Sequence, residues 1–426
     1  MAVRVTIPER EVRRNFALNL FNGAVFNFAS KLIDPPLILT WFVSQLTTSN
    51  LLIGMVAPLG QAGWFLPQIF ISARIQRMER KMPGYTLGAV VRVVAWLFLA
   101  VLVWLVRDPF FLLVGFFTLY AIASVSAGLG GISFFDVVAK TIPARQRGRL
   151  FAWRQFLGGA LGLGAGWIVN RILNYPALPF PRGHAVLIFL YCALIAPAMA
   201  AFIAIREPSG TALIEPVKIG EQLRRAGQLL RTDDVYLRYI LARLAIGLAS
   251  IALPFYGIYA KNVLNAPEGM VGIYVATGVG AQLCFNLPWG RLSDQHGNRL
   301  AMRLQSLGNG LTVLLALALV GLIELLEPQG SWLPYLALPL FFLDGAVRPA
   351  QMLTGNNFLL ELVPDDNRPI YLGLSNTLTG VVTLASGLGG LVVDFFGFIG
   401  LFLFALALYL IVFAMASGLP EPRNAR

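Results

Sequence analysis

The chain has 426 residues, of which 57% are hydrophobic and 13% charged, and its formal net charge is +12. Soluble domains carry about 25% charged residues, so the composition excludes an ordinary soluble protein and indicates one that lies largely in a lipid bilayer. The positive charge does not indicate a nucleic-acid partner, because the basic residues are scattered in small groups beside apolar segments rather than gathered on one polar surface.

Apolar segments long enough to cross the bilayer follow one another along the chain, since a helical span takes about 20 residues. In the first half they lie at residues 15–43, 51–72, 85–106, 110–139, 150–173 and 185–205. In the second half they lie at residues 239–260, 271–292, 302–325, 333–362, 371–393 and 397–418. The predicted fold class is therefore an all-α polytopic membrane protein with twelve transmembrane helices.

One long polar interval separates the two sets of six spans. It predicts an N-terminal six-helix bundle at residues 1–206, a cytoplasmic linker at 207–235 and a C-terminal six-helix bundle at 236–426. Apolar residues recur at helical spacing in the linker, at Ile219, Leu223, Ala226 and Leu230. This pattern fits an amphipathic helix on the cytoplasmic membrane surface, and it fits equally a flexible linker with a short solvated helix. Thr232 and Asp233, just before the next apolar run, are predicted N-caps.

The short loops predict the orientation, because Lys and Arg are retained on the cytoplasmic side. The basic loops are those of residues 4–14, 74–81, 140–149 and 291–303. All of them fall on one side of the predicted topology. Both termini are therefore expected in the cytoplasm, in a protein of the cell (plasma or inner) membrane.

An internal repeat relates the two halves at a constant offset of 221 residues (364 minus 143). The matched pairs include Gln61 and Gln282, Pro67 and Pro288, Pro143 and Pro364, and Arg147 and Arg368. Pro, Gln and Arg match by chance less readily than Leu or Gly. Two six-helix bundles in the same orientation, related by a pseudo-two-fold axis along the membrane normal, form the parallel-repeat architecture of transporters.

Two loops carry sequence strings that resemble those of a known family. The loop from Gly290 to Arg299 reads Gly-Arg-Leu-Ser-Asp-Gln-His-Gly-Asn-Arg, and the loop from Pro143 to Gly148 reads Pro-Ala-Arg-Gln-Arg-Gly. Both resemble loop signatures of the major facilitator superfamily, although the first departs from the basic positions and the second lacks its Glu. The resemblance implies the twelve-helix fold of that family.

The resemblance also implies a cytoplasmic gate. In it Asp294 would accept hydrogen bonds from a neighbouring helix N-terminus and pair with an Arg, while the glycines would allow a sharp turn. A simple turn between helices is the alternative reading. The residues expected at the gate are Gly290, Asp294, Gly297 and Arg299, together with Asp136, Arg147 and Arg368.

Four charged residues lie at membrane depth, where each costs about 2.5–3.5 kcal/mol. Lys31 and Asp34 are three residues apart in the first span, and Asp344 and Arg348 are four apart in the tenth, so each pair is expected to share a helical face. By family analogy these helices line a central cavity, where the four residues would bind the substrate or a proton. The alternative is that each pair neutralises itself and only packs the bundle.

The function predicted is secondary active transport of a small organic solute by alternating access, coupled to a proton or another ion through Asp34 or Asp344. A multidrug or metabolite efflux antiporter is the alternative, and a non-transporting receptor or a lipid-modifying enzyme is less favoured. Two cysteines and two histidines lack metal-ligand or triad spacing, so no catalytic residue, metal or cofactor is predicted. The partners expected are the solute, the coupling ion and the lipid bilayer, with the protein working as a monomer.

Overall fold

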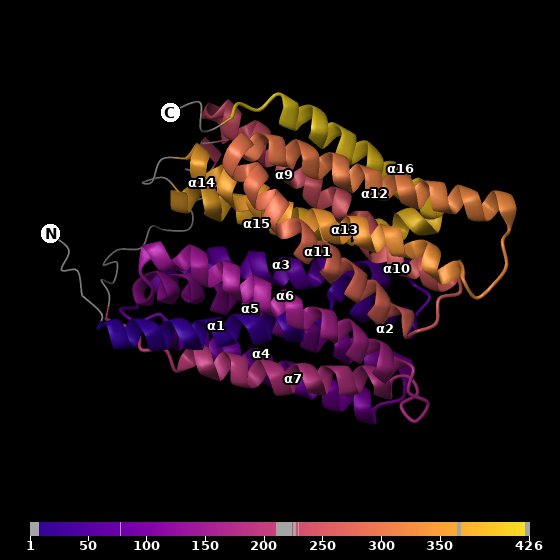
Figure 1. Ribbon diagram of the computed structural model, residues 1–426, viewed down its shortest axis with the longest axis horizontal. Coiled ribbons are helices and arrows are strands. Elements are labelled where there is room, and N and C mark those ends of the chain that lie inside the picture. The colour runs from indigo at the N-terminus through magenta and orange to yellow at the C-terminus, as the bar shows by residue number, and fades with distance from the viewer. Residues whose placement is uncertain are drawn as a thin grey trace. The chain divides into compact units, whose positions relative to one another are not determined.

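The computed structural model describes residues 8–76, 78–209, 230–363 and 368–421, together with residues 224, 227 and 228. Each regular element in these ranges is a helix (Figure 1). The first half forms α1 (Glu9–Lys31), η1 (Pro35–Leu39), α2 (Thr40–Ser44), α3 (Asn50–Gln76), α4 (Met82–Leu105), α5 (Pro109–Thr141), α6 (Ala144–Leu173) and α7 (Arg182–Ile203).

The second half forms a similar series of helices. They are α9 (Asp234–Ala249), η2 (Ser250–Ala252), α10 (Leu253–Asn262), α11 (Met270–His296), α12 (Asn298–Leu326), η3 (Leu333–Ala337), α13 (Leu338–Met352), η4 (Leu353–Asn357), α14 (Phe358–Leu362), α15 (Arg368–Ser386) and α16 (Gly389–Ser417). The side chain of Asp233 accepts a hydrogen bond from the backbone N–H of Tyr236 at 2.9 Å, which confirms it as the N-cap of α9. Most of the predicted amphipathic stretch, including Ile219, lies outside the described residues.

Eight helical stretches in the described part of the chain are long and apolar enough to cross a membrane by length and composition. Of the other predicted spans, the second is the continuous helix α3, and the first, tenth and eleventh are built from interrupted helices. The tenth combines η3, α13, η4 and α14, and the eleventh continues from α15 into the first residues of α16. Gly397 then breaks α16 with a φ of 67°, a left-handed conformation that glycine adopts without steric cost. This break confirms the predicted start of the twelfth span.

The first and seventh spans are interrupted at corresponding places. In the first, α1 ends at Lys31 and the chain resumes at the Pro35–Pro36 pair, because proline lacks the N–H that a continuing helix needs. In the seventh, the 3₁₀ turn η2 follows α9, and Pro254 lies in the first turn of α10. Asp34 shifted by the repeat offset falls at residue 255 (34 plus 221). The repeat therefore includes a broken helix in each half.

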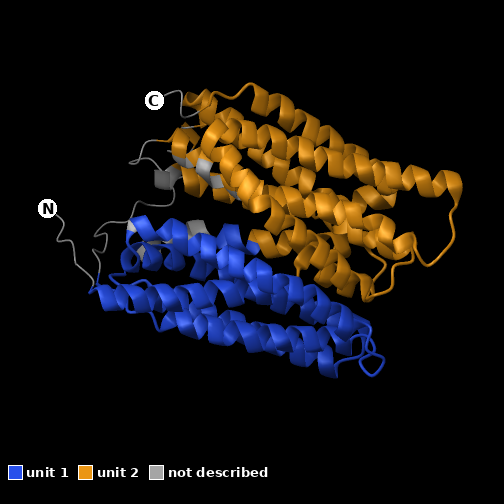
Figure 2. Ribbon diagram, viewed as in Figure 1, with its two compact units in different colours: residues 1–33, 63–218 blue, residues 34–62, 219–426 orange. Residues whose placement is uncertain are grey.

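The chain divides into two compact units (Figure 2). Unit 1 holds residues 1–33 and 63–218, and unit 2 holds residues 34–62 and 219–426. The segment 34–62, which the sequence assigns to the N-terminal bundle, thus packs within unit 2. The boundary in the first span falls between Ile33 and Asp34, at the proline break.

Aromatic side chains fill the core of each unit. In unit 1, where α4 packs against α5 and α7, the ring of Trp96 contacts those of Tyr120 and Tyr191 with centroids 5.7 and 4.9 Å apart. In unit 2, where α9 packs against α15 and α16, Tyr239 stacks on Phe358 at 4.9 Å. These buried rings contribute large apolar areas and fix the helix spacing.

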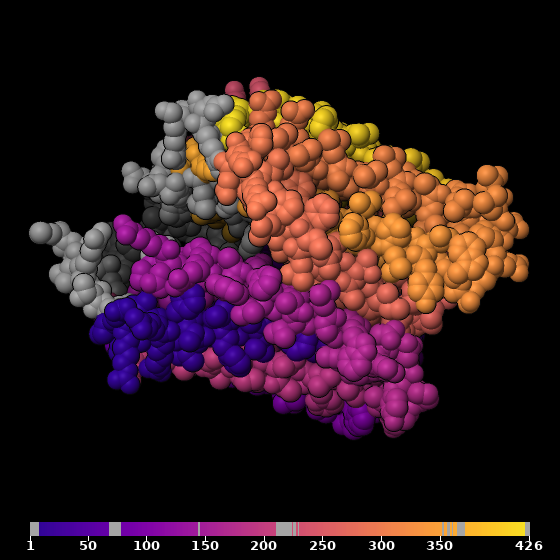
Figure 3. Space-filling model, in the orientation of Figure 1, coloured from indigo at the N-terminus to yellow at the C-terminus, as the bar shows by residue number. Residues whose placement is uncertain are grey.

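Large apolar side chains also cover the outer faces of the helices. Phe98, Phe110 and Trp167 in unit 1 are 62–67% exposed, and Leu325 in unit 2 is 81% exposed. The helix α12 contributes to the surface that Figure 3 draws. Several of its leucines are exposed there or elsewhere on the helix. Soluble monomers rarely expose apolar surfaces of this extent, so lipid is the solvent of these faces.

A test of the packing uses Gly88, where α4 meets α5. A methyl group added there would lie 2.7 Å from the carbonyl oxygen of Ser126 and 2.9 Å from the amide of Gly130. We expect Gly88→Ala to lower the stability by about 1–3 kcal/mol, because the helices must separate. Gly164→Ala is the matched control, since a methyl group there meets nothing within 4 Å. Thermal unfolding of the purified protein in detergent measures both, and equal melting temperatures would contradict the close helix contact.

Candidate functional site

A cluster of three charged side chains, two buried carboxylates and one partly exposed guanidinium, lies in unit 2. Arg348 donates from Nε to Asp344 Oδ2 at 2.8 Å, and its Nη2 lies 2.8 Å from the same oxygen. Its Nη1 lies 3.7 Å from Oδ1 of Asp34. Asp34 and Asp344 are each 8% exposed. One guanidinium therefore bridges two carboxylates that come from residues 310 positions apart (344 minus 34).

The sequence predictions for these four charged residues have different outcomes. Asp344 and Arg348 do share a face of α13, as their spacing predicts. The prediction that Lys31 and Asp34 share a helical face is wrong, because α1 ends at Lys31 and Asp34 has a non-helical ψ of 113°. Lys31 belongs to unit 1, whereas Asp34 belongs to unit 2. Because of the proline break, Asp34 does not continue the helical spacing of α1, and its carboxylate lies near the guanidinium of Arg348.

Polar contacts hold the segment 34–62 within unit 2. They join Gln45 to Glu268 (3.0 Å), Lys261 to Ser44 Oγ (2.7 Å), and Asn50 to Asp394 (2.7 Å). Glu268 lies in the loop between α10 and α11, where burial raises the pKa of its carboxyl while the hydrogen bond from Gln45 and the charge of Lys261 oppose the rise. These contacts join side chains from both halves of the sequence at one end of unit 2.

The predicted gate loop of unit 2 makes contacts that its sequence string does not indicate. Gly297 has a φ of +85° and connects α11 to α12. The backbone N–H of Arg299 donates to Glu421 Oε2 at 3.0 Å, and its guanidinium donates to the carbonyl of Ser417. A methyl group at Gly297 would lie 2.3 Å from the carboxyl carbon of Glu421. Gly297 and Arg299 thus bind the segment that follows α16.

The other two predicted residues of this loop lie on α11. Asp294 is exposed, and its gating role stays a prediction. Gly290 has open space where a side chain would start, so no close helix contact at this position depends on it in the described part of the chain. Asn298, by contrast, donates to Glu361 of α14 at 2.8 Å and accepts from Ser293 at 2.7 Å. The loop is tied to α14 through an amide that the family string does not contain.

The predicted gate residues of the first half take structural positions in unit 1. Arg147 donates from Nε to the carbonyl of Ile142 at 3.0 Å, where it satisfies the C-terminal end of α5. Asp136 forms an ion pair with Lys140 at 2.9 Å, one turn further along α5. The side chain of Arg368 lies outside the described residues. The gating role of these three residues stays a prediction.

Glu207, which the sequence reading assigned only to the polar linker, organises this end of unit 1. Its carboxylate accepts hydrogen bonds from the backbone N–H groups of Lys81 (2.8 Å) and Met82 (2.7 Å), and it pairs with Lys140 at 2.9 Å. A carboxylate at the positive end of a helix is stabilised by the helix dipole. Burial lowers the pKa of Lys81, although the charges of Asp136 and Glu207 oppose this effect. A residue just past α7 thus caps α4.

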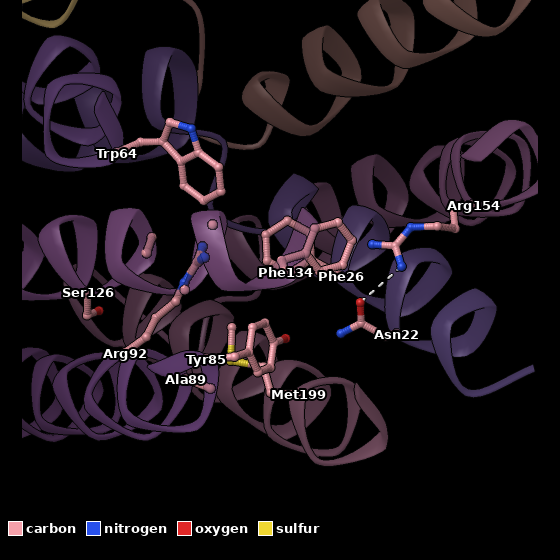
Figure 4. Close-up of a pocket in the computed structure, with 14 residues that line it drawn as sticks. Asn22, Phe26, Trp64, Tyr85, Ala89, Arg92, Ser126, Phe134, Arg154 and Met199 are labelled. Carbon is pink, nitrogen blue, oxygen red and sulfur yellow. Dashed lines mark hydrogen bonds between the residues drawn. The ribbon is translucent and has the colours of Figure 1, made fainter. Parts of the chain in front are cut away.

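Unit 1 contains a pocket of about 120 Å³ (Figure 4). It is lined by Asn22, Phe26, Trp64, Tyr85, Gly88, Ala89, Arg92, Ser126, Ala127, Gly130, Gly131, Phe134, Arg154 and Met199. The rings of Phe26 and Phe134 lie near the middle of the view, and Arg92 and Arg154 extend toward them from different helices. The wall is therefore mostly apolar and contains two guanidinium groups.

From the sequence, Arg154 near the cytoplasmic end of the fifth span is predicted to be a gate or packing partner, and Arg92 is not among the predicted site residues. The signal for Arg92 is a single arginine inside the apolar run of α4, four residues before Trp96, with no acidic residue within helical reach. A charge of this kind in a span is by itself a functional indication.

The bridging role of Arg348 predicts an asymmetric stability effect. Arg348→Gln removes the cation that bridges two buried carboxylates, and we expect a loss of about 3–5 kcal/mol. Adding Asp344→Asn should recover part of this loss, because only one of the two carboxylates then remains. Thermal unfolding in detergent compares the two variants, and a double variant no more stable than Arg348→Gln would contradict the bridge.

Comparison with known proteins finds a family match in the second half of the chain. Residues 235–426 match the family model of the Major Facilitator Superfamily. No curated protein matches the chain significantly.

Three solved structures are similar over nearly the whole chain. A D-xylose-proton symporter matches with a TM-score of 0.76 at 13% identity, over 97% of this chain and 99% of that one. A mutant of the nucleoside transporter NupG matches with a TM-score of 0.71 at 13% identity, over 94% and 99%. A bacterial homologue of the iron transporter ferroportin, in an outward-facing state, matches with a TM-score of 0.63 at 16% identity, over 98% and 100%. The TM-scores show a shared fold, and at identities this low the likeness shows the fold alone. Residues 235–426 thus match the Major Facilitator Superfamily, and the chain as a whole has the fold of these solved transporters.

Proposed function

We propose that the protein moves a small organic solute across the cell membrane by alternating access, and that it couples this movement to a proton through Asp34 and Asp344. The observation that carries the proposal is the bridge from Arg348 to two buried carboxylates. Buried ionisable groups in a membrane protein commonly mark proton or substrate pathways. This cluster has two carboxylates and one guanidinium, so one proton makes it electrically neutral.

The broken helices support the same position for the coupling site. In transporters built from repeats, substrate and ion sites lie near the bilayer midplane, where discontinuous helices expose backbone groups. Here the first span breaks beside Asp34, and the carbonyl of Asp34 accepts from the N–H of Ile38 at 2.8 Å. The seventh span breaks at the equivalent place, at η2. Asp34 is thus both a buried charge and a residue of an interrupted span.

One of the similar solved structures supports the choice of a proton as the coupling ion. The symporter with a TM-score of 0.76 is described as a D-xylose-proton symporter. The present chain shares its fold at 13% identity, so the proton is carried over only as a proposal and the sugar is not carried over. The sequence also has no glycine-rich phosphate loop, which favours an ion gradient as the energy source.

The hydrogen bonds of the segment 34–62 are the contacts that we propose to break during the cycle. If the segment 34–62 leaves its partners when that end of unit 2 opens, the hydrogen bonds at Gln45 and Asn50 must be exchanged for water. Each such bond contributes about 0.5–1.5 kcal/mol, a small enough barrier for reversible opening. We propose that this end faces the outside, with both termini in the cytoplasm of a protein that works as a monomer.

Proton coupling is tested in vesicles that contain the purified protein and a pH-sensitive dye. Solutes from several chemical classes are added in turn, including sugars, nucleosides and aromatic carboxylates. We expect at least one class to cause a protein-dependent pH change, and we expect Asp34→Asn to abolish it because the cluster loses a carboxylate. The direction of the pH change distinguishes symport from efflux by antiport.

Asp234→Asn is the matched control, because Asp234 is an exposed residue in the first turn of α9. It should leave the pH change intact. Solute movement without any pH change, or a pH change unaffected by both Asp34→Asn and Asp344→Asn, would contradict the proposed coupling site.

A further inference from the structure

We infer that the pocket of unit 1 binds the carboxylate of a small aromatic solute between Arg92 and Arg154. The role of this binding in transport rests on the proposed function, whereas the binding itself does not. The pocket differs from the cluster around Arg348 in its charge. Its lining contains two guanidinium groups and no carboxylate.

Arg154 is held in place by neutral acceptors. Its Nη1 donates to the backbone carbonyl of Asn19 at 2.6 Å and to the side-chain oxygen of Asn22 at 3.2 Å. Its guanidinium lies over the ring of Phe134 at 4.9 Å and over that of Phe151 at 5.9 Å. The residue is 9% exposed. These contacts orient the group and partly replace its hydration, but none of them supplies a negative charge.

Arg92 is held less completely. Its guanidinium lies over the ring of Phe26 at 5.0 Å. Its Nε is buried and has no hydrogen-bond partner in the described part of the chain. A buried donor without an acceptor costs about 1–3 kcal/mol. An oxygen acceptor that enters the pocket would remove this cost.

The charge balance indicates an anion. Two arginines at membrane depth cost about 2.5–3.5 kcal/mol each on insertion scales, and no carboxylate lies within ion-pair distance of either among the described residues. A planar guanidinium matches a carboxylate with two parallel hydrogen bonds. If the two arginines only stabilised the fold, acidic residues of the protein would be expected beside them, because an ion pair lowers the free-energy cost of burying each charge.

The volume and the lining of the pocket indicate the size and the apolar part of the solute. A pocket of about 120 Å³ approaches the 150 Å³ of the engineered apolar cavity that binds benzene. Phe26, Trp64 and Phe134 supply aromatic faces (Figure 4), against which a ring packs edge-to-face or offset. One aromatic ring with one carboxylate satisfies both the apolar wall and the two cations.

Benzoate, benzamide and benzylamine provide a matched set of probes, because they have the same ring with a negative, a neutral and a positive substituent. Melting temperatures of the full-length protein in detergent are measured across a concentration series of each, since a ligand that binds the native state stabilises it by mass action. We expect benzoate to raise the melting temperature and to bind about ten-fold or more tightly than benzamide. Benzylamine should have no effect.

The arginine variants then assign the binding to this pocket. Arg92→Gln should weaken benzoate binding by about ten-fold or more, and Arg92→Lys should retain part of the affinity because it keeps the charge but loses the planar fork. Arg171→Gln is the control, since Arg171 also stacks on a ring, that of Trp167 at 5.6 Å, but does not line the pocket. It should bind benzoate as the unaltered protein does.

Two results would overturn the inference. One is equal stabilisation by the three probes or none by benzoate, and the other is benzoate binding that Arg92→Gln leaves unchanged. If benzoate binds but no solute crosses the vesicle membrane, the pocket assignment stands and the transport proposal fails. If other solutes are transported while benzoate neither binds nor moves, the transport proposal stands and the pocket assignment fails.

Discussion

The cost of charge in a low-dielectric interior is the constraint on which this structure depends. A membrane-embedded carboxylate or guanidinium is retained only where partners replace its hydration. Arg348 meets this condition by bridging Asp344 on its own helix and Asp34 from the broken first span. The bridge in turn requires the Pro35–Pro36 break, because a continuous helix would keep Asp34 in the register of α1. A backbone interruption and a charge cluster therefore depend on each other.

The two units contain buried charge of opposite sign. The cluster of unit 2 has one more carboxylate than guanidinium, whereas the pocket of unit 1 has two guanidiniums and no lining carboxylate. A proton bound at the first and an organic anion bound at the second would together add no net charge to the protein. Electroneutral loading of this kind lowers the cost of moving charged groups through the bilayer, which gives the proposed proton coupling and the inferred substrate class a common physical basis.

Much of the fold could be predicted from the sequence, because apolar length and repeated Pro, Gln and Arg positions are local signals. The ion pair of Asp344 with Arg348 followed from their spacing of four. The partner of Asp34 did not, because the double proline cancels helical spacing and the pairing joins residues far apart in sequence. Arg92 and Glu207 were missed for a similar reason, since their partners come from helices that no local pattern brings together.

Infrared difference spectroscopy would show whether the Asp34–Arg348–Asp344 cluster takes up a proton, as we propose. A protonated carboxyl group absorbs separately from a carboxylate, so lowering the pH should produce a carboxylic acid band in the purified protein. We expect Asp34→Asn or Asp344→Asn to remove this band and Asp234→Asn to retain it. A band that persists in both cluster variants, or no band at any pH at which the protein stays folded, would show that the cluster does not take up the proton.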